Sequence, residues 1–157
     1  EVELPFIQAM FPDIKIVPMI CGHLTADSAG ELAKALSFLL VPENLWVISS
    51  DFTHFGRSFG YKPFADRFPE RLKELDMGAV KHILEVDSER FASYVGTTGA
   101  TICGANPIRL LLRTLEEAQA GKTLFKPELV GYTTSGELTG DYSHCVSYAG
   151  ISVYGKN

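Results

Sequence analysis

The chain has 157 residues, of which 46% are hydrophobic and 21% are charged. This length is typical of a single domain, and this composition excludes disordered and fibrous proteins. Fourteen Lys and Arg residues against nineteen Asp and Glu residues give a net charge of −5, which argues against nucleic acid or an anionic membrane as the main partner. No apolar run approaches the ~20 residues of a membrane-spanning helix.

The first third of the chain predicts two helices and two strands. Residues 1–10 form the end of a helix, and the β-branched run at 14–21 predicts a strand. Apolar residues recur at helical spacing over 25–40. The nearly continuous apolar run at 45–50 predicts a strand buried on both faces of a parallel sheet. Strand, helix and strand within this length indicate a βαβ unit.

The rest of the chain adds helices and then two strands. Asp76 is expected to cap the second of these helices and Asp87 to start the third. The tail alternates in the manner of sheet strands joined by a polar loop. The predicted helices are 64–75, 77–85, 87–95 and 106–120, and the predicted strands are 129–133 and 145–154. The expected fold class is α/β, with a mixed sheet flanked by helices.

Asp51 and His54 stand where a predicted buried strand breaks into a loop. Open α/β sheets bind ligands at this edge. If the loop curls back, the Asp51 carboxylate can orient the His54 imidazole, which can then act as a general base or bind a metal. The same spacing is also consistent with a loop-capping aspartate and a histidine that is satisfied in the interior.

Cys103 lies immediately before the predicted helix at 106–120, in the motif T-I-C-G. A cysteine at the start of a helix feels a positive potential that favours the thiolate, which suits a metal ligand or a nucleophile. Gly104 allows backbone or ligand to approach closely. The alternative is that Cys103 is a small buried residue, which is the commoner fate of a lone cysteine.

The remaining candidates for chemistry are weaker. His23 is expected in a surface loop and His82 on a solvated helix face. Asp141, His144 and Cys145 include residue types that zinc or copper accepts, although turn capping by Asp141 explains the cluster equally well. Phosphate-binding loops, nucleophile elbows and zinc-protease motifs are absent, so phosphoryl transfer and zinc proteolysis have no support.

The three cysteines, Cys21, Cys103 and Cys145, are scattered without a C-x-x-C pair. An odd number at irregular spacing fits a reducing compartment better than a disulfide framework. With no signal peptide visible, the expected location is the cytoplasm.

Five segments together resemble the Memo family. They are E-V-E-L-P-F-I, I-V-P-M-I-C-G, V-I-S-S-D-F-T-H-F-G, T-I-C-G-A-N-P-I and C-V-S-Y-A-G, and they occur in the family's order along nearly the whole chain. Memo proteins are similar in fold to class III extradiol dioxygenases, which are non-haem iron enzymes. The resemblance therefore implies a dioxygenase-like α/β fold for residues 1–157.

The resemblance also implies a metal site. It assigns Cys103 as a metal ligand, together with two histidines from a more N-terminal part of the domain. It matches His54 to the acid–base histidine of the dioxygenases and Asp51 to its neighbour in the pocket. An E-H-S segment with one metal histidine normally precedes the L-P-F opening, so we expect both histidines upstream of residue 1 and the domain to lack its N-terminal part.

The leading hypothesis is a Memo-like metal-binding redox protein, with copper as the expected metal and iron or zinc as alternatives. A thiolate with imidazoles favours copper(I) on grounds of ligand softness. Family members are described as copper-binding and, in animals, as signalling effectors that dock phosphotyrosine peptides. One alternative is thus a non-catalytic phosphopeptide-binding module that uses His54 and Arg57. Another is an extradiol-type dioxygenase acting on a small-molecule substrate with non-haem iron.

Overall fold

The protein was analysed as a computed structural model that describes residues 2–119 and 125–155. The first residue of the helix predicted over 1–10 and the last residue of the helix predicted over 106–120 lie outside the described residues. In chain order the elements are α1 (Leu4–Met10), α2 (Ala26–Leu36), the 3₁₀ helix η1 (Ser37–Leu39), β1 (His54–Gly56), the 3₁₀ helix η2 (Arg57–Phe59), α3 (Phe68–Leu84), α4 (Ser88–Thr98), α5 (Ala105–Gln119), β2 (Phe125–Thr134), α6 (Ser135–Thr139) and β3 (His144–Gly155).

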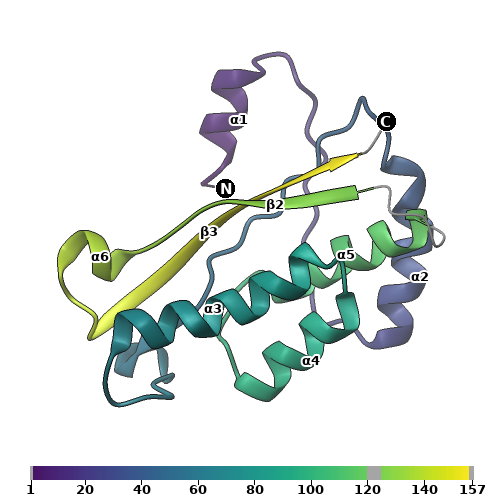
Figure 1. Cartoon of the computed structure of the whole chain (residues 1–157). Helices are drawn as coiled ribbons and strands as arrows, with labels where there is room; N and C mark the ends of the chain where they lie inside the picture. Colours follow the sequence, from purple (N-terminus) through teal and green to yellow (C-terminus); the bar gives the residue numbers. More distant parts are fainter. Residues whose placement is uncertain (1, 120–124, 156–157) are drawn as a thin grey trace.

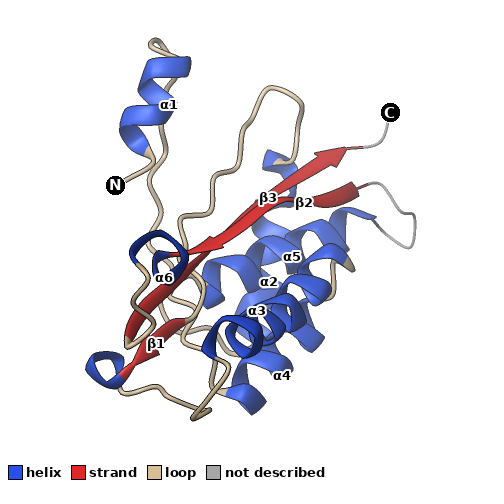
Figure 2. Ribbon diagram, turned by 60° about the vertical axis from the view of Figure 1, so that its left-hand side comes forward, coloured by secondary structure: helices blue, strands red, loops and turns tan. Residues whose placement is uncertain are grey.

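The sheet has the order β1-β3-β2, and both of its strand pairs are antiparallel. His54 pairs with Val146 in one ladder and Phe125 with Gly155 in the other. Helices α2 to α5 lie together on one side of the β2–β3 ribbon, whereas α1 stands apart on the other side (Figures 1 and 2). The α/β class is confirmed at this level. The predicted mixed sheet and its parallel βαβ unit are wrong, because the described strands pair only antiparallel.

Neither predicted strand of the first third forms in the described residues. Residues 14–21 and 45–50 are irregular, and most of their apolar side chains are exposed, with Val17 80% accessible. In the second segment only alternate side chains are covered, among them Ile48, which packs on the core. An apolar β-branched run predicts strand tendency, but a strand also needs a hydrogen-bonding neighbour, which these segments do not have here.

Besides α1, which matches the helix predicted over residues 1–10, three predicted helices are confirmed, and local capping explains where two of them begin. Thr25 Oγ1 accepts a hydrogen bond from the Ser28 N–H at 3.1 Å at the start of α2. The Asp87 carboxylate accepts from the Arg90 N–H at 2.8 Å at the start of α4. Such side-chain caps satisfy donors that the helix itself leaves unpaired. The third, α5, begins directly after Cys103 and Gly104.

The predicted break at Asp76 is wrong. A single 17-residue helix, α3, runs through this position, and residues 64–67 precede it. Asp76 is completely buried and accepts hydrogen bonds from Thr53 and Tyr132, which belong to other parts of the chain. An aspartate at a cap would instead bond the first turn of its own helix.

The main core lies between the sheet and the helices. Its buried members come from the segment before β1, from α3, α4 and α5, and from the loop between α4 and α5, and they include Phe52, Phe91, Ile102 and Leu112. Phe52 adjoins Asp51, and Ile102 adjoins Cys103, so the same apolar cluster anchors both loops that carry the candidate chemistry. Within the described residues, no helix has the length and apolar character needed to cross a membrane.

Candidate metal centre

Two loops bring together the three residues that carry the sequence hypotheses. Asp51 lies on the segment that leads into β1, His54 is the first residue of β1, and Cys103 lies on the loop that leads into α5. One ligand atom from each of the three lies within 4.8 Å of the others. Carboxylate, imidazole and thiolate are all established metal ligands. Residues 52 positions apart therefore form one cluster, although their chemical roles stay predictions.

Cys103 is held by backbone hydrogen bonding from the other loop. The Asp51 N–H donates to the Cys103 sulfur, with the nitrogen and Sγ 3.1 Å apart. The cysteine itself is exposed, so its sulfur remains open to a ligand. The geometry suits a cysteine that acts as a metal ligand or nucleophile.

Gly104 sets how closely the two loops approach. Its N–H donates to Ser50 Oγ at 2.9 Å. A Cβ atom on Gly104 would lie 2.3 Å from the Ser50 Cβ, which is far inside van der Waals contact. Only glycine allows this approach, so the G of the T-I-C-G motif has a steric role at the site.

His54 faces Asp51, with His54 Nε2 and Asp51 Oδ2 3.5 Å apart. The His54 Nε2 atom is buried, and it has no hydrogen-bond partner among the described residues. Buried ring nitrogens are normally satisfied, so an unpaired one requires an explanation. An imidazole nitrogen open toward a carboxylate and a thiol fits a metal or an exchangeable proton.

Thr101 holds the backbone of His54, and Phe59 packs against its side chain. Thr101 Oγ1 accepts from the His54 N–H at 2.9 Å and donates to the His54 carbonyl at 2.7 Å. The Phe59 ring packs edge-on against the imidazole, with the ring centroids 5.0 Å apart. Sequence reasoning missed both residues. Thr101 belongs to the T-I-C-G motif, and that motif is the one signal that could have pointed to it.

The weaker sequence candidates lie elsewhere. His23 is exposed, as predicted. His144 hydrogen-bonds Ser58 and stacks on Phe59, and neither it nor Cys145 joins the cluster of Asp51, His54 and Cys103. Asp141 Oδ1 accepts from the Ser143 N–H at 2.8 Å, which confirms turn capping. The Ser143 hydrogen bonds also hold the pKa of the Asp141 carboxyl below its usual value.

His82 differs from its prediction. Its side chain is only 17% exposed and lies beside Glu85 and the Tyr94 ring, so it is not a solvated surface residue. In the sequence His82 stands between charged Lys81 and apolar Ile83, which leaves its exposure undecided. Only the tertiary structure shows that Tyr94 of α4 covers it.

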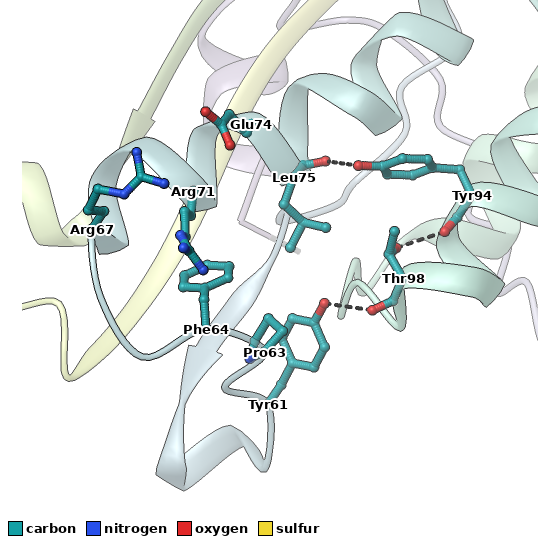
Figure 3. A pocket seen from close by; sticks show the side chains of 9 residues that line it. All are labelled: Tyr61, Pro63, Phe64, Arg67, Arg71, Glu74, Leu75, Tyr94 and Thr98. Carbon is teal, nitrogen blue, oxygen red and sulfur yellow. Dashed lines mark hydrogen bonds between the residues drawn. The ribbon is translucent and has the colours of Figure 1, made fainter.

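A separate surface hollow of about 570 Å³ lies between α3 and α4 (Figure 3). Arg67 and Arg71 lie at one end, and Tyr61 and Tyr94 at the other. Both tyrosine hydroxyls are engaged with backbone carbonyls, those of Thr98 and Leu75. None of the three cluster residues lines this hollow, so the candidate chemistry does not coincide with it.

Comparison with known proteins gives one consistent match. A family profile described as "Memo-like protein" matches residues 1–152. A MEMO1 family protein of Pyrococcus furiosus is 34% identical over 161 residues, which cover 96% of this chain and 54% of that protein. Protein MEMO1 of Xenopus tropicalis is 31% identical over 160 residues, covering 95% and 53% respectively. The chain thus spans about half the length of the curated relatives it matches.

Proposed function

Because the chain belongs to the Memo-like protein family, we propose that it is a metal-binding redox protein whose thiolate ligand is Cys103. The observation that supports this proposal is the cluster of Asp51, His54 and Cys103, with ligand atoms within 4.8 Å of one another. The proposal includes a pocket of the class III extradiol dioxygenase type around this cluster, and two further imidazole ligands.

The proposed ligands, the Cys103 thiolate and two imidazoles, favour copper. A thiolate is a soft ligand and selects copper(I), with iron(II) and zinc as alternatives, whereas carboxylate and carbonyl oxygens would favour harder ions. Bound copper would supply one-electron redox chemistry. Replacing the carboxylate of a 2-His-1-carboxylate iron site by a thiolate makes ring-cleaving dioxygenase chemistry the less favoured reading.

His54 is proposed to move a proton at Nε2. This atom is buried, lacks a hydrogen-bond partner in the described part of the chain, and lies 3.5 Å from the Asp51 carboxylate. A carboxylate at this distance can orient the ring. Thr101 holds the backbone of His54 through two hydrogen bonds, so the ring is supported before any ligand binds.

The test is a copper(I) titration of the intact protein, including the segment expected to carry the two histidines, against a chromogenic competitor. We expect Cys103→Ser to weaken binding by more than about tenfold, because a hydroxyl is a much poorer ligand for copper(I) than a thiolate. The matched control is Cys21→Ser, since Cys21 is a free cysteine outside the cluster. Its affinity should stay within about twofold of wild type. Equal affinities of all three proteins would remove Cys103 from the site.

A second candidate, phosphotyrosine-peptide docking in signalling, is favoured by the position of Arg57. This arginine is exposed on η2, whose Phe59 packs against His54. A guanidinium can pair with a phosphate through two parallel hydrogen bonds. In a fluorescence-polarisation assay with a phosphotyrosine peptide, Arg57→Gln should weaken binding about tenfold, whereas Lys62→Gln on the same loop should not. Binding that survives Arg57→Gln would discard this candidate.

A further inference from the structure

Asp76 is a buried carboxylate that the proposed chemistry does not use. It lies in the middle of α3 and is completely inaccessible to solvent. Its Oδ1 accepts hydrogen bonds from Thr53 Oγ1 at 2.6 Å and from the Thr53 N–H at 3.3 Å. Its Oδ2 accepts from the Tyr132 hydroxyl at 2.7 Å. A buried carboxylate is costly unless donors of this kind surround it.

The donors come from segments that are distant in the sequence. Thr53 stands between Asp51 and His54, and Tyr132 lies on β2. Burial and the neighbouring Asp76 carboxylate raise the pKa of Tyr132, so the phenol keeps its proton and remains a donor. The Tyr132 hydroxyl also lies 3.4 Å from Ser147 Oγ on β3. Asp76 thus joins α3, the sheet and the site segment in one buried network.

The site segment itself is held by each of its four backbone N–H groups. The Asp51 N–H donates to Cys103 Sγ and the Phe52 N–H to the Ser147 carbonyl. The Thr53 N–H donates to Asp76, and the His54 N–H donates to Thr101 Oγ1. These partners lie on three different parts of the chain: the loop between α4 and α5, helix α3 and strand β3. Among them only Asp76 also binds a side chain of the segment, through the Thr53 hydroxyl.

We propose that Asp76 is a positioning residue for the metal centre: through Thr53 it fixes residues 51–54 so that Asp51 and His54 face Cys103. The part of this inference that concerns copper(I) affinity rests on the proposed function. Asp76 touches neither the thiol nor the imidazole, and it acts only through the segment it anchors. Residues that hold metal ligands in place typically change metal affinity by about 10–100-fold when they are lost.

The test uses Thr53→Val in the intact protein, including the segment expected to carry the two histidines. Valine keeps the shape of threonine and removes only the hydroxyl that donates to Asp76. We expect copper(I) affinity to fall about tenfold. In the metal-free protein we expect hydrogen exchange at amides 51–54 to accelerate about fivefold relative to the core amides of α5. Thr53→Ser, which restores the donor, should recover both values to within about twofold.

The matched control is Thr114→Val. Thr114 is also completely buried, and its hydroxyl donates to the Leu110 carbonyl within α5, so this change removes one buried hydrogen bond away from the site. It should leave copper affinity and exchange at amides 51–54 within about twofold of wild type. The proposal is overturned if Thr53→Val behaves like Thr114→Val in both measurements.

The two proposals can fail separately. If the intact wild-type protein, with the segment that carries the two expected histidines, binds no copper(I), the proposed function fails, whereas exchange at amides 51–54 still tests the anchoring by Asp76. A second metal-free measurement is the alkylation rate of Cys103 by iodoacetamide, read by mass spectrometry. Thr53→Val should change this rate at least threefold, since the Asp51 N–H that contacts Sγ belongs to the same segment. An unchanged rate together with unchanged exchange overturns the positioning role.

Discussion

Replacing Gly104 by alanine is expected to disrupt the candidate metal centre and to destabilise the protein. The new methyl group would lie 2.3 Å from the Ser50 Cβ and 2.5 Å from Ser50 Oγ, so the two loops must separate. Overpacking of this kind costs about 1–3 kcal/mol. Because Ser50 adjoins Asp51, the separation also moves the Asp51 N–H away from Cys103 Sγ. Copper(I) affinity should fall about 10–100-fold.

The matched control for this substitution is Gly96→Ala. Gly96 lies within α4, and a Cβ atom there would meet nothing within 4 Å. Alanine in a helix is favoured over glycine by about 0.5–1 kcal/mol, so the control should gain stability. Urea unfolding and copper(I) titration of both variants measure the contrast. Equal stability and equal affinity for Gly104→Ala and wild type would contradict the close approach of the two loops.

Truncating Leu112 to alanine is expected to cost about 2–5 kcal/mol of unfolding free energy, because it leaves a cavity in the main core. Leu112 is 1% exposed on α5 and belongs to the apolar cluster that includes Phe52 and Ile102. These two residues adjoin Asp51 and Cys103. The loss of packing should therefore loosen both site loops as well as lower global stability.

The control for the cavity is Leu138→Ala on α6, where the leucine side chain is 77% exposed. Surface substitutions of this kind usually change stability by less than about 0.5 kcal/mol. Urea denaturation gives both unfolding free energies, and hydrogen exchange at amides 51 and 103 reports the loops. If Leu112→Ala lowers the free energy of unfolding no more than Leu138→Ala does, Leu112 does not belong to the core.

Local sequence signals predicted the helices well. Thr25 and Asp87 are followed by apolar residues at helical spacing, and both residues cap the helices that they were expected to start. The tail alternation likewise predicted β2 and β3, which pair along their length. These features depend on residues within one or two helical turns, or on the period of a single strand, so the sequence alone carries them.

Long-range interactions decided the features that sequence reasoning missed. Residues 14–21 and 45–50 have the composition of strands, but they find no strand neighbour in the described part of the chain. Asp76 has the residue type of a helix cap, yet Thr53 and Tyr132 supply its hydrogen bonds, so α3 continues through it. No local pattern indicates which distant donors will meet a buried carboxylate.

The candidate site divides in the same way. The sequence by itself determined the chemical types, a carboxylate and an imidazole after an apolar run and a thiol before a helix, and it determined the family. The tertiary structure alone decided that these groups lie within 4.8 Å of one another, because their separation depends on Gly104 contacting Ser50 and on Phe52 and Ile102 sharing one core. Side-chain chemistry is encoded residue by residue, whereas proximity across 52 positions arises only from packing.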